Sequence, residues 1–245
     1  MMKNKEPLLP IADAPILHCE HLKKSYGKKT VLEDFSLTLP KGRIIGLLGP
    51  NGCGKTTFLK LVSGLLVPNG GSIEICGHPR SELTNSMISF LPERSYFSSS
   101  LRVRELLEQF SDFFADFDAA MAEEMLRDLN ISPDSPLKTL SKGMKEKTQL
   151  AVVMSRRTKL YMLDEPIGGV DPASREYILG KIIGGYNKDA SVIITTHLIS
   201  DIEPILDEFA FMTYGGGIVR RGVADEAREE YGMSLDEQFR EVFRC

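Results

Sequence analysis

Apolar residues along this chain form short runs that alternate with segments in which apolar residues recur at helical spacing. Residues 31–39 alternate apolar and polar side chains, as a strand with one buried face does, whereas residues 44–48 carry no polar side chain. This alternation of strands and helices is typical of an α/β protein with a largely parallel sheet. We expect strands at 16–26, 31–39, 43–48, 72–76, 87–91, 160–163 and 191–195, two closing strands near 208–221, and a helix over 56–65.

A helical segment interrupts the strand pattern between about residues 93 and 136. Apolar residues recur at helical spacing in 103–114 and 118–129, and the strand-like character disappears there. The segment therefore predicts an all-helical insert in the α/β core. Further helices are expected over 141–155, after Pro172, and after Ser234, where Ser-Leu-Asp-Glu fits a capping box.

Length and composition agree with a globular protein that buries a sizeable core. The 245 residues are 42% apolar and 26% charged, which suits one large domain or a core with an inserted subdomain. A net charge of −4 with well-mixed signs leaves no basic field, so no nucleic-acid partner is expected. No apolar run approaches the roughly 20 residues that span a bilayer.

The cysteines and the N-terminal residues predict where the protein works. Cys19, Cys53, Cys76 and Cys245 show no metal-ligand spacing, which indicates reduced thiols in an intracellular protein. Residues 1–15 lack the apolar core of a signal peptide and contain three prolines, so they predict a flexible leader.

A glycine-rich stretch at 49–57, Gly-Pro-Asn-Gly-Cys-Gly-Lys-Thr-Thr, follows the apolar run at 44–48 directly. It satisfies the phosphate-loop pattern G-x-x-x-x-G-K-[ST]. Glycines let backbone N–H groups point inward around phosphates, and the following helix adds the positive end of its dipole. Lys55 is expected to reach the terminal phosphates and Thr56 to bind Mg²⁺. Nucleotide-binding positions are therefore expected at Asn51, Gly52, Cys53, Gly54, Lys55, Thr56 and Thr57.

Cys53 allows two interpretations. A helix N-terminus acidifies a thiol, so Cys53 could be redox-sensitive. The interpretation we favour is a small filler residue in the loop.

Two acids end the apolar strand at 160–163. Asp164, at a strand tip near the phosphates, could hold the metal through water, and Glu165 could polarise the attacking water. A surface turn with solvated acids is the alternative, and Pro166 favours it. The phosphate loop weighs against that alternative, and the adjacent glutamate indicates hydrolysis of a nucleotide by water.

A third motif, Leu140-Ser141-Lys142-Gly143-Met144, stands just upstream of the acidic strand and opens a helix. Ser141 is a good N-cap, and Gly143 permits close backbone approach to a ligand. The segment resembles the LSGGQ-type signature of ABC (ATP-binding cassette) ATPases, and the likeness covers the chain from about 16 to 243. It implies a RecA-like P-loop core with an antiparallel β subdomain and the helical insert, an ATPase domain over 16–223, and a helical tail over 224–245.

The resemblance assigns further residues. Ser141 and Gly143 would face the nucleotide of a second cassette, so that two ATP molecules are sandwiched between two subunits. Tyr26 matches the aromatic residue that stacks on adenine, with a core tyrosine as the alternative. His197 matches the histidine that contacts the γ-phosphate. Asp171 matches a loop that communicates across the dimer, and it also reads as an N-cap before Pro172.

Three positions depart from the family pattern. Glu93 replaces the usual glutamine, which senses the metal and links to the transport partner, and a glutamate can still reach Mg²⁺. Lys142 replaces the middle glycine of the signature, and Met144 replaces its glutamine. The backbone donors and Ser141 remain, so the resemblance implies a working but slower site.

The function implied is that of the ATP-binding subunit of an ABC transporter, at the cytoplasmic face of the membrane. LPE at 91–93, LSKGM, the G-x-D-P turn and Leu235 to Phe239 resemble exporters of the antibiotic- and ion-efflux type. The partners would be a separately encoded membrane permease and a second ATP-binding subunit, in a homo- or heterodimer. Candidate permease contacts are Tyr96, Phe97, Leu101 and Val103, with packing inside the insert as the alternative.

Two other functions are compatible with this family. One is a soluble ABC ATPase in cofactor biogenesis or a ribosome-linked process; the single cassette and the short insert weigh against the translation and DNA-repair types. The other is a non-hydrolysing structural cassette, against which Glu165 and His197 both argue.

Overall fold

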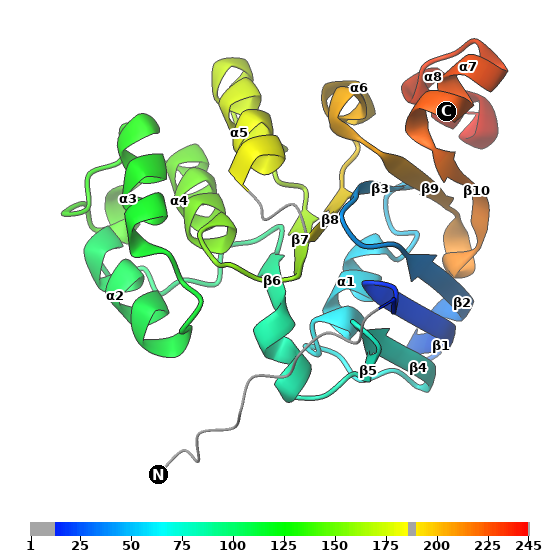
Figure 1. The fold of residues 1–245 in the computed structure, drawn as a ribbon, viewed down its shortest axis with the longest axis horizontal. Helices are drawn as coiled ribbons and strands as arrows, with labels where there is room; N and C mark the ends of the chain where they lie inside the picture. Colours follow the sequence, from blue (N-terminus) through cyan, green and yellow to red (C-terminus); the bar gives the residue numbers. More distant parts are fainter. Residues whose placement is uncertain (1–12, 186–189, 245) are drawn as a thin grey trace.

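Two β-sheets and a group of helices make up the computed structural model, which describes residues 13–185 and 190–244 (Figure 1). Most of the leader, and Cys245, lie outside these ranges. Within the described residues, no helix combines the length and the apolar character needed to cross a membrane.

The larger sheet has six strands, and all neighbours but one pair are parallel. The antiparallel pair is the closing hairpin at one edge, which confirms the largely parallel core expected from the sequence. In spatial order the strands are β10 (Ile218–Val223), β9 (Glu208–Met212), β3 (Ile44–Leu48), β8 (Ser191–Thr195), β7 (Leu160–Asp164) and β6 (Ile88–Leu91).

The smaller sheet is antiparallel and holds the expected β subdomain. Its order is β2 (Lys29–Leu39), β1 (Leu17–Tyr26), β4 (Gly70–Ile75) and β5 (His78–Pro79). The alternating pattern holds at the end of β2, which buries Phe35, Leu37 and Leu39, whereas an irregularity in its pairing with β1 places Leu32 instead of Val31 in the core.

The continuously apolar central strands are buried on both faces. In β3, Ile45 and Leu47 join the core that contains β1 and β2, whereas Ile44 and Leu48 join the core under the helical insert. This is why the parallel strands read as uninterrupted apolar runs, since each successive side chain enters a different core.

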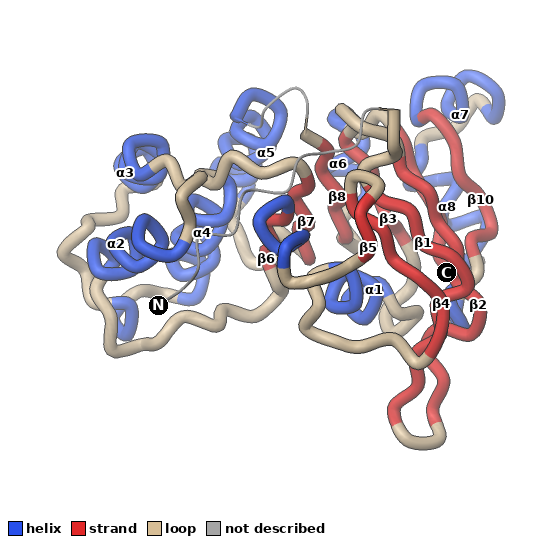
Figure 2. Tube along the Cα trace, turned by 60° about the horizontal axis from the view of Figure 1, so that its bottom comes forward, coloured by secondary structure: helices blue, strands red, loops and turns tan. Residues whose placement is uncertain are grey.

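Helices pack on the sheets and form the insert. Figures 1 and 2 both show α2, α3 and α4 grouped at the β6 side of the molecule, away from the antiparallel sheet and α1. The helices are α1 (Lys55–Val62), α2 (Val103–Phe113), α3 (Ala119–Asp128), α4 (Lys142–Met154), α5 (Pro172–Gly185), α6 (Ile199–Ile202), α7 (Ala224–Tyr231) and α8 (Leu235–Phe243).

Several boundaries differ from the sequence-based expectation. Helix α1 ends at Val62 rather than near residue 65, and Leu65 is left 64% exposed. The two-residue strand β5 and the helix α6 were not predicted, whereas α7 lies within the helical tail expected over 224–245. The capping box that opens α8 is confirmed: the Glu237 amide donates to Ser234 Oγ at 3.2 Å, and the Ser234 amide donates to Glu237 Oε2 at 2.9 Å.

Candidate active site

The glycine-rich stretch connects β3 to α1 and shapes an anion-binding loop. Gly52 and Gly54 have φ of 81° and 117°, values that residues with a Cβ rarely adopt. A Cβ on Gly49 would lie 2.3 Å from the Met212 carbonyl oxygen, so only glycine fits there. No side chain caps α1 and its first turn carries no acid, which leaves its N-terminal N–H groups open to an anion.

Lys55 lies inside this loop. It is only 8% exposed, and its Nζ donates to the carbonyl oxygens of Gly49 at 2.6 Å and Pro50 at 3.2 Å. The loop's own carbonyls therefore hold the ammonium group at the first turn of α1, where phosphates would meet it.

Asp164 ends β7 with one carboxylate oxygen satisfied and one not. Its Oδ1 accepts a hydrogen bond from Thr195 Oγ1 at 2.6 Å, whereas its buried Oδ2 has no hydrogen-bond partner. An orphaned buried carboxylate oxygen is costly unless a cation or water meets it. The neighbouring Thr56 lines the same pocket.

Glu165 is held in an unusual backbone conformation, with φ of 53°. Its Oε2 accepts a hydrogen bond from Thr196 Oγ1 at 3.0 Å and lies 2.9 Å from His197 Nδ1. The turn after β7 and the turn after β8 thus bring Glu165 and His197 together although they are distant in the sequence. Positive φ at a residue with a side chain is a strained arrangement that occurs preferentially at functional sites.

One pocket of about 910 Å³ collects most of the expected site residues. It is lined by Tyr26, Asn51, Gly52, Gly54, Lys55, Thr56, Thr57, Glu93, Asp164, Glu165 and His197, all of them predicted from the sequence. It is also lined by Lys29, Val31, Arg94, Ser95, Lys142, Lys145, Glu146, Gly168 and Gly169.

Tyr26 ends β1 at the rim of this pocket and is 47% exposed. The alternative of a core tyrosine is therefore wrong. The Lys24 ammonium lies over its ring, with Nζ 5.5 Å from the centroid.

Three expected nucleotide-binding residues do not line the pocket of their own chain. The Cys53 side chain is 1% exposed and faces the interior, and burial raises the pKa of its thiol. Ser141 caps α4 by accepting from the Met144 amide at 3.2 Å, and neither Ser141 nor Gly143 lines the pocket. A Cβ on Gly143 would make only an ordinary contact within the chain, 3.5 Å from the Gly169 oxygen.

Asp171 is confirmed as the N-cap of α5. Its Oδ1 accepts from the Ser174 amide at 3.0 Å, and its Oδ2 pairs with Lys147 Nζ at 2.8 Å. The Lys147 ammonium and the Ser174 amide lower the pKa of the Asp171 carboxyl below its ordinary range. The ion pair ties the loop before α5 to the signature helix α4.

Sequence reasoning missed three supporting residues. Thr195 and Thr196 position the two acids, and their signal is a pair of hydroxyls at the end of the apolar run of β8. Gln149 is 1% exposed on α4, and its Nε2 donates to the Pro92 carbonyl at 3.0 Å, which holds the loop that carries Glu93. Nothing in the local sequence distinguishes Gln149 from a solvated glutamine.

Comparison with known proteins shows which protein family this chain belongs to. Residues 32–168, more than half of the chain, match the family described as ABC transporter, and the chain belongs to it. It therefore has an ATP-binding and ATP-hydrolysing domain, and it functions as the ATP-binding subunit of an ABC transporter.

Individual relatives are similar in sequence to this chain over most of its length. It is 28% identical to the Nod factor export ATP-binding protein I of Ralstonia nicotianae, over 97% of this chain and 77% of that protein. It is 30% identical to the ABC transporter ATP-binding protein YtrB of Bacillus subtilis, over 88% of this chain and 75% of that one. A solved ATP-binding subunit of an ABC transporter superposes with a TM-score of 0.83 and 28% identity, covering 93% and 99% of the two chains.

Proposed function

We propose that this chain powers export through a separately encoded membrane permease, hydrolysing ATP at the cytoplasmic face of the membrane in a dimer of ATP-binding subunits. The observation that carries the proposal is the convergence, in one pocket, of the phosphate loop with Asp164, Glu165 and His197. The Nod factor export relative supports the direction of transport.

The residues around Asp164 in the pocket are suited to bind magnesium. The described residues contain no cluster of three or more His, Cys, Asp or Glu that could cage a metal. Mg²⁺, however, is usually held by one or two carboxylates together with substrate phosphates and waters. Asp164 with its unpaired Oδ2, the Thr56 hydroxyl and Glu93 would hold it, and when bound it would neutralise charge on the phosphates.

The chain's own residues supply the remaining roles. Lys55 and the open N–H groups of α1 bind the phosphates, and Tyr26 stacks on adenine. Glu165 orients the attacking water and accepts its proton, while Thr196 and His197 fix the orientation of its carboxylate.

A second ATP-binding subunit completes the site. Ser141 and Gly143 stand at the start of α4 but do not line the pocket of their own chain. The Ser141 cap takes the Met144 amide, so the amides of Lys142 and Gly143 in the first turn of α4 would meet the phosphates of a neighbouring subunit, and the glycine at 143 would allow close approach there.

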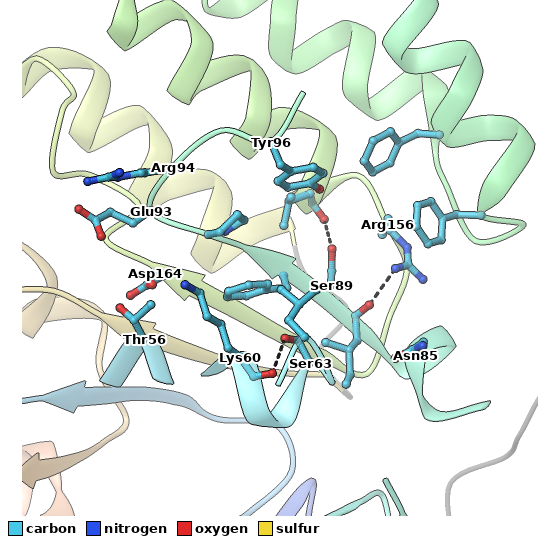
Figure 3. Close-up of a pocket in the computed structure, with 17 residues that line it drawn as sticks. Thr56, Lys60, Ser63, Asn85, Ser89, Glu93, Arg94, Tyr96, Arg156 and Asp164 are labelled. Atoms are coloured by element: carbon cyan, nitrogen blue, oxygen red, sulfur yellow. Dashed lines mark hydrogen bonds between the residues drawn. The ribbon is translucent and has the colours of Figure 1, made fainter. Parts of the chain in front are cut away.

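The permease docks in a groove of about 820 Å³ between the core and the helical insert (Figure 3). Its lining is mostly apolar and includes Ile88, Phe90, Phe110, Phe114 and Tyr96. Of the contacts expected from the sequence, Tyr96 is 58% exposed at the groove, whereas Val103 is fully buried and packs inside the insert. Val103 as a permease contact is therefore wrong.

The experiment that tests the catalytic assignment is the substitution Glu165→Gln. It keeps the shape of the side chain but removes the proton acceptor, so turnover should fall by about 10²–10⁴-fold while ATP still binds and a dimer accumulates. Steady-state hydrolysis, nucleotide calorimetry and light scattering measure the three quantities.

The matched control is Glu229→Gln, which neutralises an exposed glutamate on α7. It should leave hydrolysis unchanged. Undiminished hydrolysis by Glu165→Gln would remove Glu165 from its role. Copurification of the native chain with ribosomes instead of a membrane protein would favour the soluble alternative.

A further inference from the structure

In the part of the chain that the structure describes, two buried side-chain oxygens lack a hydrogen-bond partner, and both belong to acids that line the nucleotide pocket. One is Asp164 Oδ2, which the proposed magnesium would satisfy. The other is Oε2 of Glu146, at the start of the second turn of the signature helix α4. A buried acceptor without a donor is costly, so a donor is expected to reach Glu146 Oε2 in another state of the protein.

Glu146 packs directly against the loop that precedes α5. A Cβ on Gly169 would lie 2.0 Å from Glu146 Oε2 and 2.7 Å from its Oε1, so the carboxylate fills the space that a side chain at 169 would need. Gly143 faces the same loop from the previous turn of α4, since a Cβ there would lie 3.5 Å from the Gly169 oxygen. Lys142 pairs with Oε1 at 3.7 Å and leaves Oε2 without a partner.

The backbone of Gly169 offers a matching donor. Its two neighbours donate within the loop, Gly168 to the Glu165 carbonyl oxygen at 3.2 Å and Val170 to the Ile167 carbonyl oxygen at 3.3 Å. Among the described residues, the Gly169 amide between them has no acceptor. An unused donor and an unused acceptor therefore lie close together, and a small shift of the loop would join them.

The same loop covers Glu165, the proposed proton acceptor. A Cβ on Gly168 would lie 3.7 Å from Glu165 Oε2, so the backbone next to Gly169 packs on the catalytic carboxylate. Glu165 has φ of 53°, and a strained backbone persists only where its surroundings hold it in place. Lys147, also on α4, pairs with Asp171 at the end of the loop at 2.8 Å. Helix α4 therefore contacts this loop at two points.

We propose that Glu146 is a positioning residue for Glu165: when the site closes on ATP, Glu146 Oε2 accepts a hydrogen bond from the Gly169 amide and fixes residues 168–171 over the catalytic carboxylate. The inference rests on the proposed function, since it takes Glu165 as the residue that activates water. Glu146 acts through the loop and not on the nucleotide. Its loss should therefore lower kcat and leave the affinity for ATP unchanged.

The first test compares two substitutions of Glu146 that keep the length of the side chain. Glu146→Gln keeps an acceptor oxygen and should retain kcat within about twofold. Glu146→Met removes both oxygens and should lower kcat about tenfold, because a displaced loop misplaces the catalytic carboxylate. Steady-state hydrolysis measures kcat. Calorimetry with a non-hydrolysable ATP analogue should give the same affinity for both variants, and urea denaturation reports whether both are folded.

The second test uses the close approach of Gly169 to Glu146. The three atoms nearest to a Cβ at 169 all belong to the Glu146 carboxyl group, so Gly169→Ala should push that group away from the loop. It should lower kcat about tenfold in the parent chain, but less than about twofold in a Glu146→Ala chain, where the obstacle is gone. The control is Glu123→Ala, which truncates an exposed glutamate on α3 outside the pocket and should leave kcat unchanged.

A loss of kcat with Glu146→Gln as large as that with Glu146→Met would overturn the inference. An equal loss from Gly169→Ala with and without the Glu146 side chain would overturn it too, as would a fall in affinity for the analogue at unchanged kcat. The proposed function fails instead if Glu165→Gln retains full turnover. If Glu165→Gln abolishes turnover while the Glu146 variants match the parent chain, only the role of Glu146 is refuted.

Discussion

Cys53 lies inside the phosphate loop, yet its sulfur faces the protein interior beside Gly49. Burial raises the pKa of the thiol, and the nearby Lys55 opposes this only in part. A raised pKa means a smaller thiolate fraction at any given pH, and the thiolate is the reactive form. Cys53 is therefore a packing residue, as favoured from the sequence, and not a redox sensor.

We expect Cys53 to resist alkylation in the folded protein at neutral pH and to react readily after unfolding in urea. Iodoacetamide labelling followed by peptide mass spectrometry measures both rates. Cys53→Ala should keep ATP turnover within about twofold, because Cys53 is buried and does not line the nucleotide pocket. Fast alkylation of the native protein that ATP blocks would contradict this view.

At the scale of residues, site residues can be predicted from the sequence where they lie together in one short motif. Gly54, Lys55 and Thr56 are recognisable because a phosphate loop needs those residue types at that spacing. Thr196 and Gln149 were missed because their partners, Glu165 and Pro92, are distant in the chain. Their roles depend on tertiary contacts, and the only local signal was the pair of hydroxyls at 195 and 196.

At the scale of elements, Arg156 clamps the helical insert to the sheet. It follows α4, is 5% exposed, and makes two hydrogen bonds of 3.1 and 3.0 Å to Asp116, between α2 and α3. It also donates to the Ile88 carbonyl of β6 at 2.8 Å and stacks 3.9 Å from the Phe114 ring. One guanidinium therefore connects the insert with the edge strand of the core.

Arg156→Met should lower the free energy of unfolding by about 3 kcal/mol, because it leaves the Asp116 carboxylate without its partner in a half-buried site. Urea denaturation measures the loss. Arg157→Met is the control, since Arg157 is 76% exposed where it pairs with Asp118. It should shift the unfolding midpoint far less than Arg156→Met, because solvent screens an exposed ion pair. Equal midpoints for the two variants would refute the clamp.

Element prediction succeeded where periodicity was strong and failed where elements were short. The expected central strands are present because each is apolar on both faces. Strand β5 has two residues and helix α6 has four, too few to show a period. Helix α1 stops early because Gly64, with φ of 75°, adopts the left-handed conformation that ends helices, and Leu65 beyond it is exposed.

At the scale of the whole molecule, the nucleotide pocket and the groove beside the insert share a wall. Thr56, Glu93 and Asp164 line both cavities, and the groove extends from them to Phe110 and Arg156 (Figure 3). A change in the nucleotide bound in the pocket therefore affects a partner bound in the groove directly, through the side chains that line both cavities. This arrangement suits an ATPase that drives a partner protein.

Tyr96 is an exposed aromatic residue of the groove, and its substitution is the most direct test of docking by the partner. It is 58% exposed, and its ring lies 4.7 Å from that of Phe97, which packs on Phe110. Truncating an exposed aromatic anchor in an interface costs about 1–2 kcal/mol, so Tyr96→Ala should weaken docking about tenfold. ATP binding by the isolated chain should not change.

The measurement is the fraction of the chain that sediments with membranes when it is coexpressed with a candidate multi-span permease. Tyr231→Ala is the matched control, because Tyr231 is 39% exposed on α7 and lies outside the groove. Loss of membrane association with Tyr96→Ala but not with Tyr231→Ala would place the permease at the groove. Equal association of both variants would require a different docking face, since no folding defect is expected from an exposed ring.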